Sequence, residues 1–154
     1  MTINNDIGFI ILKLTNHPIY DTLLENISTF VKNMPYDQVV IFNSFSDKIN
    51  TSSIPILHIS HAKFFNGTII VFDLASIILT KNFTNIRKKI LYTRDMPWVD
   101  SRNTPYGEWV NMYNDASLDI VANSHQLSDV YQICWKKPIG VAEDINYEQF
   151  KNFI

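Results

Sequence analysis

Apolar and polar residues along this chain follow two alternating patterns. Short runs rich in isoleucine and valine, with few polar interruptions, are typical of strands covered on both faces. Between these runs, apolar residues recur every three or four positions, which predicts amphipathic helices. The runs that predict strands span residues 6–14, 37–43, 54–60, 67–74, 88–95, 118–123 and 137–144.

Helices are predicted between most of these strands. The first, over 18–34, begins with a proline that suits a first helical turn, and Thr15 and Asn16 offer capping oxygens before it. The remaining helical patterns cover residues 75–83, 106–114 and 125–135 and an amphipathic tail, 146–154. The segment 96–105, bracketed by prolines, predicts an irregular loop.

Strands that alternate with helices predict the α/β class, as a three-layer α/β/α sandwich with a mostly parallel, Rossmann-like sheet. The chain of 154 residues has the length of one ordinary domain, which we expect to span residues 1–154. Right-handed crossovers bring the strand-to-helix loops to one edge of such a sheet, and ligands bind there, where strand order reverses. Functional residues are therefore expected at the carboxyl ends of strands.

Composition and charge exclude several classes of protein. Hydrophobic residues make up 46% of the chain and charged residues 18%, as in a folded globular domain. The apolar stretches are too short to cross a bilayer and no signal peptide precedes them, so neither a membrane nor export is expected. The single cysteine, Cys134, forms no disulfide within one chain and favours a cytoplasmic location. The net charge of −2, with only small basic clusters, argues against nucleic-acid binding.

Several motif-based chemistries are also excluded. The four glycines stand alone, so no phosphate-binding loop can be assembled and no cofactor is predicted. No G-x-S-x-G turn is present for a serine nucleophile. His58 and His61 would point to opposite faces of a strand, so no metal site is predicted.

His17 is the strongest candidate for catalysis, because it follows the first strand at the expected ligand edge. A neutral imidazole there can accept a hydroxyl proton, and a carboxylate behind it would fix its tautomer. Asp95, at the end of another strand, is a candidate for that carboxylate. The alternative is that His17 is simply an exposed residue at the entry to a helix.

Other strand ends supply candidates for binding. Arg94 and Trp98 share one loop with Asp95, a mixture that suits sugars but equally suits an internal ion pair and a packing tryptophan. Asn16 and His61 also follow strands and are predicted to contact a ligand.

The stretch DIVANSHQLSDV, residues 119–130, joins a strand to a helix. Asn123 as N-cap with Gln126 three positions on forms a variant of the capping box. The predicted buried face of the helix consists of Leu127, Val130, Tyr131 and Cys134. Ser124 and His125 stand at the positive end of the helix dipole, where they are candidates for ligand contact.

The last third of the chain resembles the end of the N-terminal, acceptor-side domain of glycosyltransferases of the two-Rossmann-domain (GT-B) type. In that family a strand ends in Asn-Ser, a helix follows, and a last strand leads into a glycine-containing turn with a phenylalanine shortly after. The matching positions here are Asn123, Ser124, Gly140, Val141, Asp144 and Phe150. Residue usage also resembles that of glycosyltransferase-like proteins of large tailed phages, which would place the chain in a host cytoplasm.

The resemblance implies binding or transfer of a sugar or nucleotide-sugar, and some inverting members use a histidine after the first strand as base, the position of His17. The resemblance covers only the acceptor-side half of that family, so we expect the chain to lack the usual donor-binding domain. Three interpretations therefore stay open. The chain is an enzyme completed by a donor-binding partner protein or by its own oligomer, a binding module for a nucleotide-sugar or glycan, or a non-catalytic scaffold.

Overall fold

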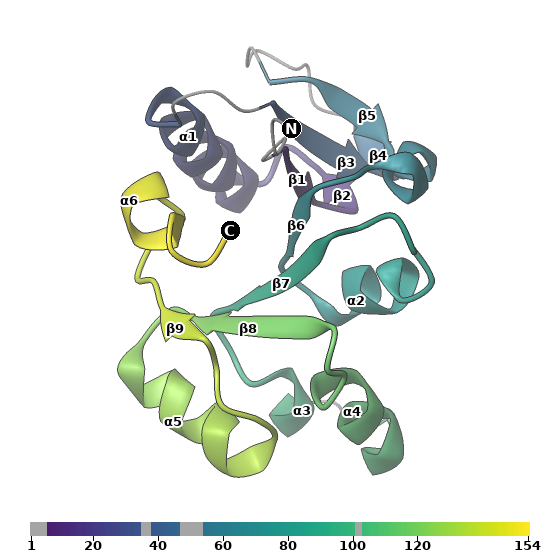
Figure 1. Ribbon diagram of the computed structural model, residues 1–154, viewed down its shortest axis with the longest axis vertical. Helices are drawn as coiled ribbons and strands as arrows, with labels where there is room; N and C mark the ends of the chain where they lie inside the picture. Colours follow the sequence, from purple (N-terminus) through teal and green to yellow (C-terminus); the bar gives the residue numbers. More distant parts are fainter. Residues whose placement is uncertain (1–5, 35–37, 47–53, 101–102) are drawn as a thin grey trace.

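The computed structural model describes residues 6–34, 38–46, 54–100 and 103–154, and its centre is a seven-stranded parallel sheet (Figure 1). The strand order is β5-β3-β1-β6-β7-β8-β9. These strands are β1 (Ile7–Ile10), β3 (Val39–Asn43), β5 (Ile56–His58), β6 (Thr68–Val71), β7 (Lys88–Thr93), β8 (Leu118–Ala122) and β9 (Gly140–Val141). Two short strands, β2 (Lys13–Leu14) and β4 (Phe45–Ser46), pair separately in a small parallel sheet.

Helices flank this sheet on both sides and complete the predicted three-layer α/β/α arrangement. They are α1 (Pro18–Lys32), the 3-10 helix η1 (Ile59–Phe64), α2 (Leu74–Thr80), α3 (Pro97–Asp100), α4 (Tyr106–Tyr113), α5 (His125–Cys134) and α6 (Tyr147–Phe150). Helices α1 and α6 lie side by side over one face, while α2 and α4 lie on the other side (Figure 1). The Rossmann-like fold class predicted from the sequence is confirmed.

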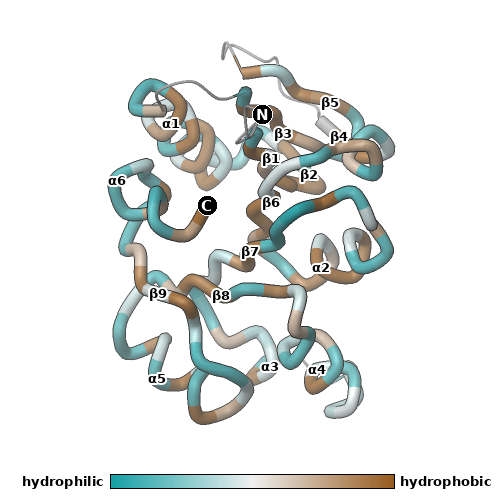
Figure 2. Tube along the Cα trace, viewed as in Figure 1, coloured by the Kyte–Doolittle hydropathy of each residue, from teal (hydrophilic) through white to brown (hydrophobic). Residues whose placement is uncertain are grey.

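The strands are apolar on both faces because each face supports its own core. In β1, Phe9 belongs to the core beneath α1, whereas Ile10 belongs to the core beneath α2, α4 and α5. In β7, Tyr92 likewise belongs to the core beneath α1, and Leu91 belongs to the core on the other face. Hydrophobic residues accordingly concentrate along the central strands, and polar residues lie on the outer parts of the helices (Figure 2). This double burial explains why the strands show continuous apolar runs rather than alternation.

Several local predictions are wrong. The run 6–14 is not one strand, because β1 ends at Ile10 and the chain leaves the main sheet to form β2. The segment 96–105 is not wholly irregular, since α3 begins at Pro97, where a proline suits a first helical turn. Cys134 is exposed rather than buried, because it is the last residue of α5. The predicted strand start at 37 lies outside the described residues.

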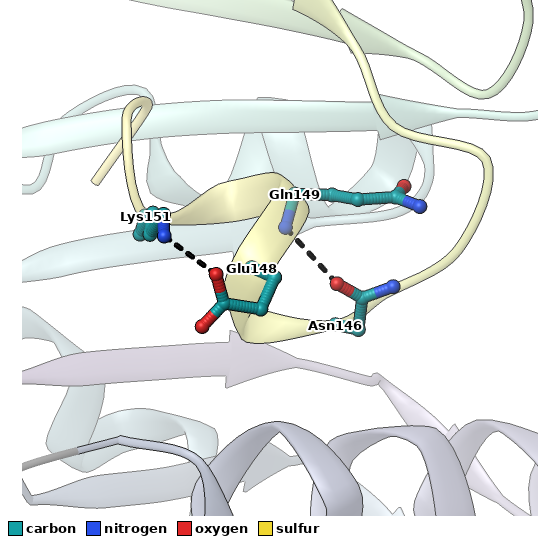
Figure 3. Close-up of polar contacts among 4 residues, drawn as sticks. All are labelled: Asn146, Glu148, Gln149 and Lys151. Atoms are coloured by element: carbon teal, nitrogen blue, oxygen red, sulfur yellow. Dashed lines mark hydrogen bonds and ion pairs between the residues drawn. The ribbon is translucent and has the colours of Figure 1, made fainter.

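Helix α6 holds the end of the sequence against the core beneath α1. Asn146 caps the helix, with its Oδ1 accepting the Gln149 N–H at 3.0 Å, and Lys151 pairs with Glu148 on the exposed side (Figure 3). Phe150 points inward and is fully buried, with its ring centre 6.1 Å from that of Phe30 in α1. The cap therefore fixes a short helix whose inner face joins the first helix of the chain.

Tyr92 connects β7 to the segment between β9 and α6. Its hydroxyl donates to the backbone oxygens of Ala142 and Glu143, both at 3.0 Å. Burial raises the pKa of Tyr92, an effect that nearby Arg94 opposes, so the hydroxyl is protonated at neutral pH and acts as donor. The bond to Ala142 is buried, and water cannot easily replace it.

Replacing Tyr92 by phenylalanine is expected to lower the free energy of unfolding by about 1–2 kcal/mol, because the buried Ala142 carbonyl and the partly buried Glu143 carbonyl lose their shared donor. Urea denaturation followed by circular dichroism measures the change. Tyr106→Phe is the matched control, since Tyr106 is 72% exposed and its loss of a hydroxyl should change little. Equal effects of the two substitutions would show that the buried hydrogen bond is not what matters.

Candidate functional site

The order of the strands reverses at β1. From β1 the chain continues to β3 on one side, whereas β6 pairs with β1 on the other side. In open parallel sheets the loops that leave two such neighbouring strands diverge and leave a crevice at their carboxyl ends. A pocket of about 410 Å³ occupies this position and is lined by Ile10, Ile11, Leu12, Lys13, Ile19, Tyr20, Leu23, Phe72, Asp73, Ala75, Arg94 and Ile145. We call it the switch-point pocket.

The walls of the switch-point pocket are mainly apolar, and three charged residues lie among the apolar side chains. Lys13 comes from β2, Asp73 follows β6, and Arg94 follows β7. Two cations and one carboxylate leave a surplus of one positive charge. A pocket of this kind suits a ligand that combines an apolar or ring-shaped body with an anionic group.

Local structure restrains two of these side chains. Asp73 is the N-cap of α2, and its Oδ1 accepts the Ser76 N–H at 2.7 Å, which fixes the carboxylate at the rim of the pocket. The guanidinium carbon of Arg94 lies 5.4 Å from the centre of the Tyr92 ring, an arrangement favoured by cation–π attraction. The pocket therefore presents preorganised charges on the loops that follow β6 and β7.

A smaller pocket of about 300 Å³ adjoins the first and shares Phe72, Asp73 and Ala75 with it. Its inner wall carries buried hydroxyl groups. The hydroxyls of Thr93 and Tyr131 lie 2.8 Å apart, and Thr93 Oγ1 donates to the Asp95 carbonyl at 3.1 Å. Burial raises the pKa of Tyr131, so the phenol is neutral. These hydroxyls already bond one another, which makes this network a support for the β7 loop.

His17 is an exposed residue at the entry to a helix, as the alternative interpretation of the sequence had it. It is the N-cap of α1, and its Nδ1 accepts the Ile19 N–H at 3.3 Å, so the prediction that Thr15 or Asn16 caps this helix is wrong. The ring is exposed, lines neither of the two pockets and has no carboxylate partner among the described residues. In the tautomer that accepts this bond, Nε2 carries the proton and offers a donor rather than a base.

Asp95 lies apart from His17. It lines the smaller pocket, and its backbone oxygen accepts bonds from the Thr93 and Tyr131 hydroxyls. No hydrogen bond or ion pair joins Asp95 to His17 in the described part of the chain. The structure therefore does not assemble the predicted acid–base pair, and a catalytic role for either residue stays a prediction.

Of the residues predicted to bind, only Arg94 lines the switch-point pocket. Trp98 packs edge-on against Tyr113, Tyr131 and Trp135, so it serves as a packing tryptophan. His61 lies in η1 and lines a separate groove beside β5. Asn16 is exposed in the turn before α1.

The predicted cap of α5 is displaced by one residue. Ser124, not Asn123, is the N-cap, and its Oγ accepts the Leu127 N–H at 3.2 Å. Asn123 directly follows the last residue of β8, and its N–H donates to the Thr93 carbonyl of β7 at 3.0 Å. His125 is the exposed first residue of α5 and lines neither pocket.

The sequence prediction includes Asp73 among the strand-end residues at the expected ligand edge but gives it no role, and it does not include Lys13, although each carries a visible signal. Lys13 is the only charged residue in the run 7–14, and Asp73 directly follows the apolar run 68–72. A charged residue that interrupts or ends a buried strand is expected at an accessible strand end. What the sequence could not supply is the strand order that brings these two residues to one pocket.

The fold and the pocket define a Rossmann-like α/β protein with a ligand-sized crevice at its switch point. Comparisons of the chain with protein-family models, with curated proteins and with solved structures found no match. The described residues contain no group of three or more metal-binding side chains. None of the helices among these residues has the length and apolar character that a membrane span requires.

Proposed function

We propose that this chain is a glycosyltransferase-like binding domain, whose switch-point pocket takes a small anionic ligand of the nucleotide or nucleotide-sugar class. The observation that carries the proposal is the coincidence of an apolar pocket of about 410 Å³ with Lys13, Arg94 and Asp73 at the point where strand order reverses. Pockets of this size are typical of small-molecule sites.

Each part of such a ligand has a matching group in the pocket. The apolar side chains of Ile11, Leu23 and Phe72 can cover a flat base or the apolar face of a sugar. Lys13 and Arg94 can neutralise a phosphate, to which a guanidinium can donate two parallel hydrogen bonds. Because Asp73 uses Oδ1 as a helix cap, its other oxygen is the one available to accept a ligand hydroxyl.

The geometry favours binding over catalysis by the isolated chain. His17 is used as a helix cap and lines neither pocket. The switch-point pocket is also open to solvent on one side, whereas sugar transfer requires a closed cleft that excludes water. Transfer would therefore require a donor-binding partner protein or a second copy of the chain to close over this edge of the sheet.

UDP-glucose, UDP and neutral oligosaccharides are suitable probes in thermal-shift and calorimetric titrations. We expect a nucleotide or nucleotide-sugar to stabilise the protein, and Arg94→Gln to weaken its binding about tenfold or more through the loss of a charged hydrogen bond. Asp73→Asn, which retains a capping oxygen, should weaken only ligands that have a hydroxyl at that position.

Two controls sharpen this test. Lys137→Gln removes a positive charge from an exposed residue outside the pocket and should leave affinity unchanged. His17→Asn retains a capping acceptor but removes the imidazole, and it should also leave affinity unchanged. If no nucleotide, nucleotide-sugar or glycan shifts the melting temperature, the binding proposal fails and the scaffold interpretation takes its place.

A further inference from the structure

A separate pocket of about 440 Å³ lies at the opposite, amino-terminal edge of the sheet. It is formed where β7 and β8 begin, next to the segment that follows α2. None of its lining residues belongs to the switch-point pocket. Because parallel strands begin at one edge and end at the other, the two sites are on opposite edges of the sheet.

This pocket gathers positive charge. Four cationic residues line it, and Asp119 is the only carboxylate that the described residues contribute to its lining. The cationic residues are Lys81, Arg87, Lys88 and Lys89. Lys88 pairs with Asp119 at 3.5 Å, and the lining as a whole keeps a surplus of positive charge. Such an excess is notable in a chain whose net charge is −2. We call this site the basic pocket.

Lys89 is the residue in the basic pocket that is best placed to donate hydrogen bonds to a bound anion. Only 8% of its surface is exposed, and its ammonium donates one long hydrogen bond, 3.5 Å, to the Lys81 carbonyl. An ammonium has three donors, and a phosphate that enters the pocket can accept from those that the Lys81 carbonyl does not use. Desolvation by burial lowers the pKa of Lys89, and the nearby Asp115 carboxylate opposes this shift without removing it.

Asp115 is itself engaged by other groups. Its Oδ1 accepts bonds from the backbone N–H and the hydroxyl of Ser117, at 2.8 Å and 2.7 Å. The neighbouring ammonium of Lys136 donates to the Asp115 and Leu118 carbonyls. The carboxylate therefore attracts Lys89 from a distance but does not saturate its donors.

We infer that the basic pocket binds the phosphate group of a small molecule, with Lys89 as its central donor and Lys81 and Arg87 around it. A phosphate fits because it offers several acceptor oxygens to cations that come from different segments. Phe83 and Ile86 form an apolar wall that can cover the organic part of a phosphomonoester.

Inorganic phosphate and pyrophosphate are the probes, titrated by calorimetry into the full chain at constant ionic strength. We expect pyrophosphate to bind, Lys89→Met to weaken it tenfold or more, and Lys89→Arg to retain affinity within about threefold. Methionine at this position should leave the protein folded, because an apolar side chain of similar length replaces a buried ammonium.

A control variant and a second background keep the result interpretable. Lys137→Met, at an exposed position outside the pocket, should bind as the unaltered chain does. Because Arg94 belongs to the switch-point pocket, which is itself proposed to take a phosphate, Lys89→Met is also measured in an Arg94→Gln background, where it should still weaken pyrophosphate binding. Loss of binding in Arg94→Gln with full binding in Lys89→Met would assign the phosphate to the other edge of the sheet and overturn the inference. Equal binding by Lys89→Met and the unaltered chain would overturn it as well.

Discussion

Phe30→Ala is expected to lower the free energy of unfolding by about 3–5 kcal/mol, the range for truncating a buried phenylalanine. Phe30 is 0% exposed and lies where α1, β1 and α6 meet. Its ring centre is 5.5 Å from that of Phe9, 5.9 Å from that of Tyr147 and 6.1 Å from that of Phe150. Alanine would leave a cavity bounded by three aromatic rings that cannot all move inward. Urea denaturation, with the m-value checked for two-state behaviour, measures the loss.

Phe64→Ala is the matched control for this substitution. It deletes the same side chain, but Phe64 is 70% exposed on η1 and its ring contacts the Lys63 ammonium at 4.8 Å. We expect a change below about 1 kcal/mol, because little apolar surface is returned to water. If the two alanine variants lose similar stability, the aromatic core beneath α1 is not the main source of stability on that face.

Gly67→Ala is expected to lower the free energy of unfolding by about 1–3 kcal/mol through overpacking. A methyl group at this position would lie 2.3 Å from the Asp6 carbonyl oxygen and 2.9 Å from the ring of Phe65. The backbone cannot simply yield, since Thr68 donates to the Asp6 carbonyl at 3.0 Å and Arg87 donates to the Gly67 carbonyl at 3.0 Å. Chemical denaturation or calorimetry detects the loss.

Gly107→Ala is the opposite case and serves as control. A methyl group added at Gly107 would meet no neighbouring atom within 4 Å, and the residue is in the first turn of helix α4. Alanine there should raise stability by up to about 1 kcal/mol, because it has the higher helix propensity. If both alanine variants changed stability in the same direction, the close approach of backbone to Gly67 would not explain the result.

The sequence predicted the fold well because burial on both faces leaves a strong signal. Continuous apolar runs indicated strands such as β6 and β7, and helical spacing indicated α1 and α4. The predicted strand boundaries were wrong where one apolar run contains parts of two different sheets, as it does between Ile10 and Lys13. Hydrophobicity reports burial, and both sheets are partly buried, so periodicity alone cannot detect that crossing.

The candidate site was harder to predict. Which strand ends lie next to one another depends on the order of the strands in the sheet, and the sequence does not show that order. Arg94 was selected from the polar residues after β7, but its neighbours in the pocket, Lys13 and Asp73, follow other strands. His17 illustrates a second difficulty. An imidazole at the start of a helix can bind a ligand or cap the helix. Here the hydrogen bond from the Ile19 N–H to Nδ1 shows that the ring caps the helix. Residue type and position do not distinguish these roles.

The contact between α1 and α6 affects when the core beneath α1 can form during synthesis of the chain. Phe30 and Phe150 pack together although they come from opposite ends of the sequence, and parallel strands also pair only with partners distant along the chain. Folds dominated by such long-range contacts fold slowly. During synthesis on a ribosome, the face of the sheet beneath α1 would stay incompletely covered until residue 150 has emerged. The aromatic core beneath α1 is therefore completed only when α6 has formed and packed against α1.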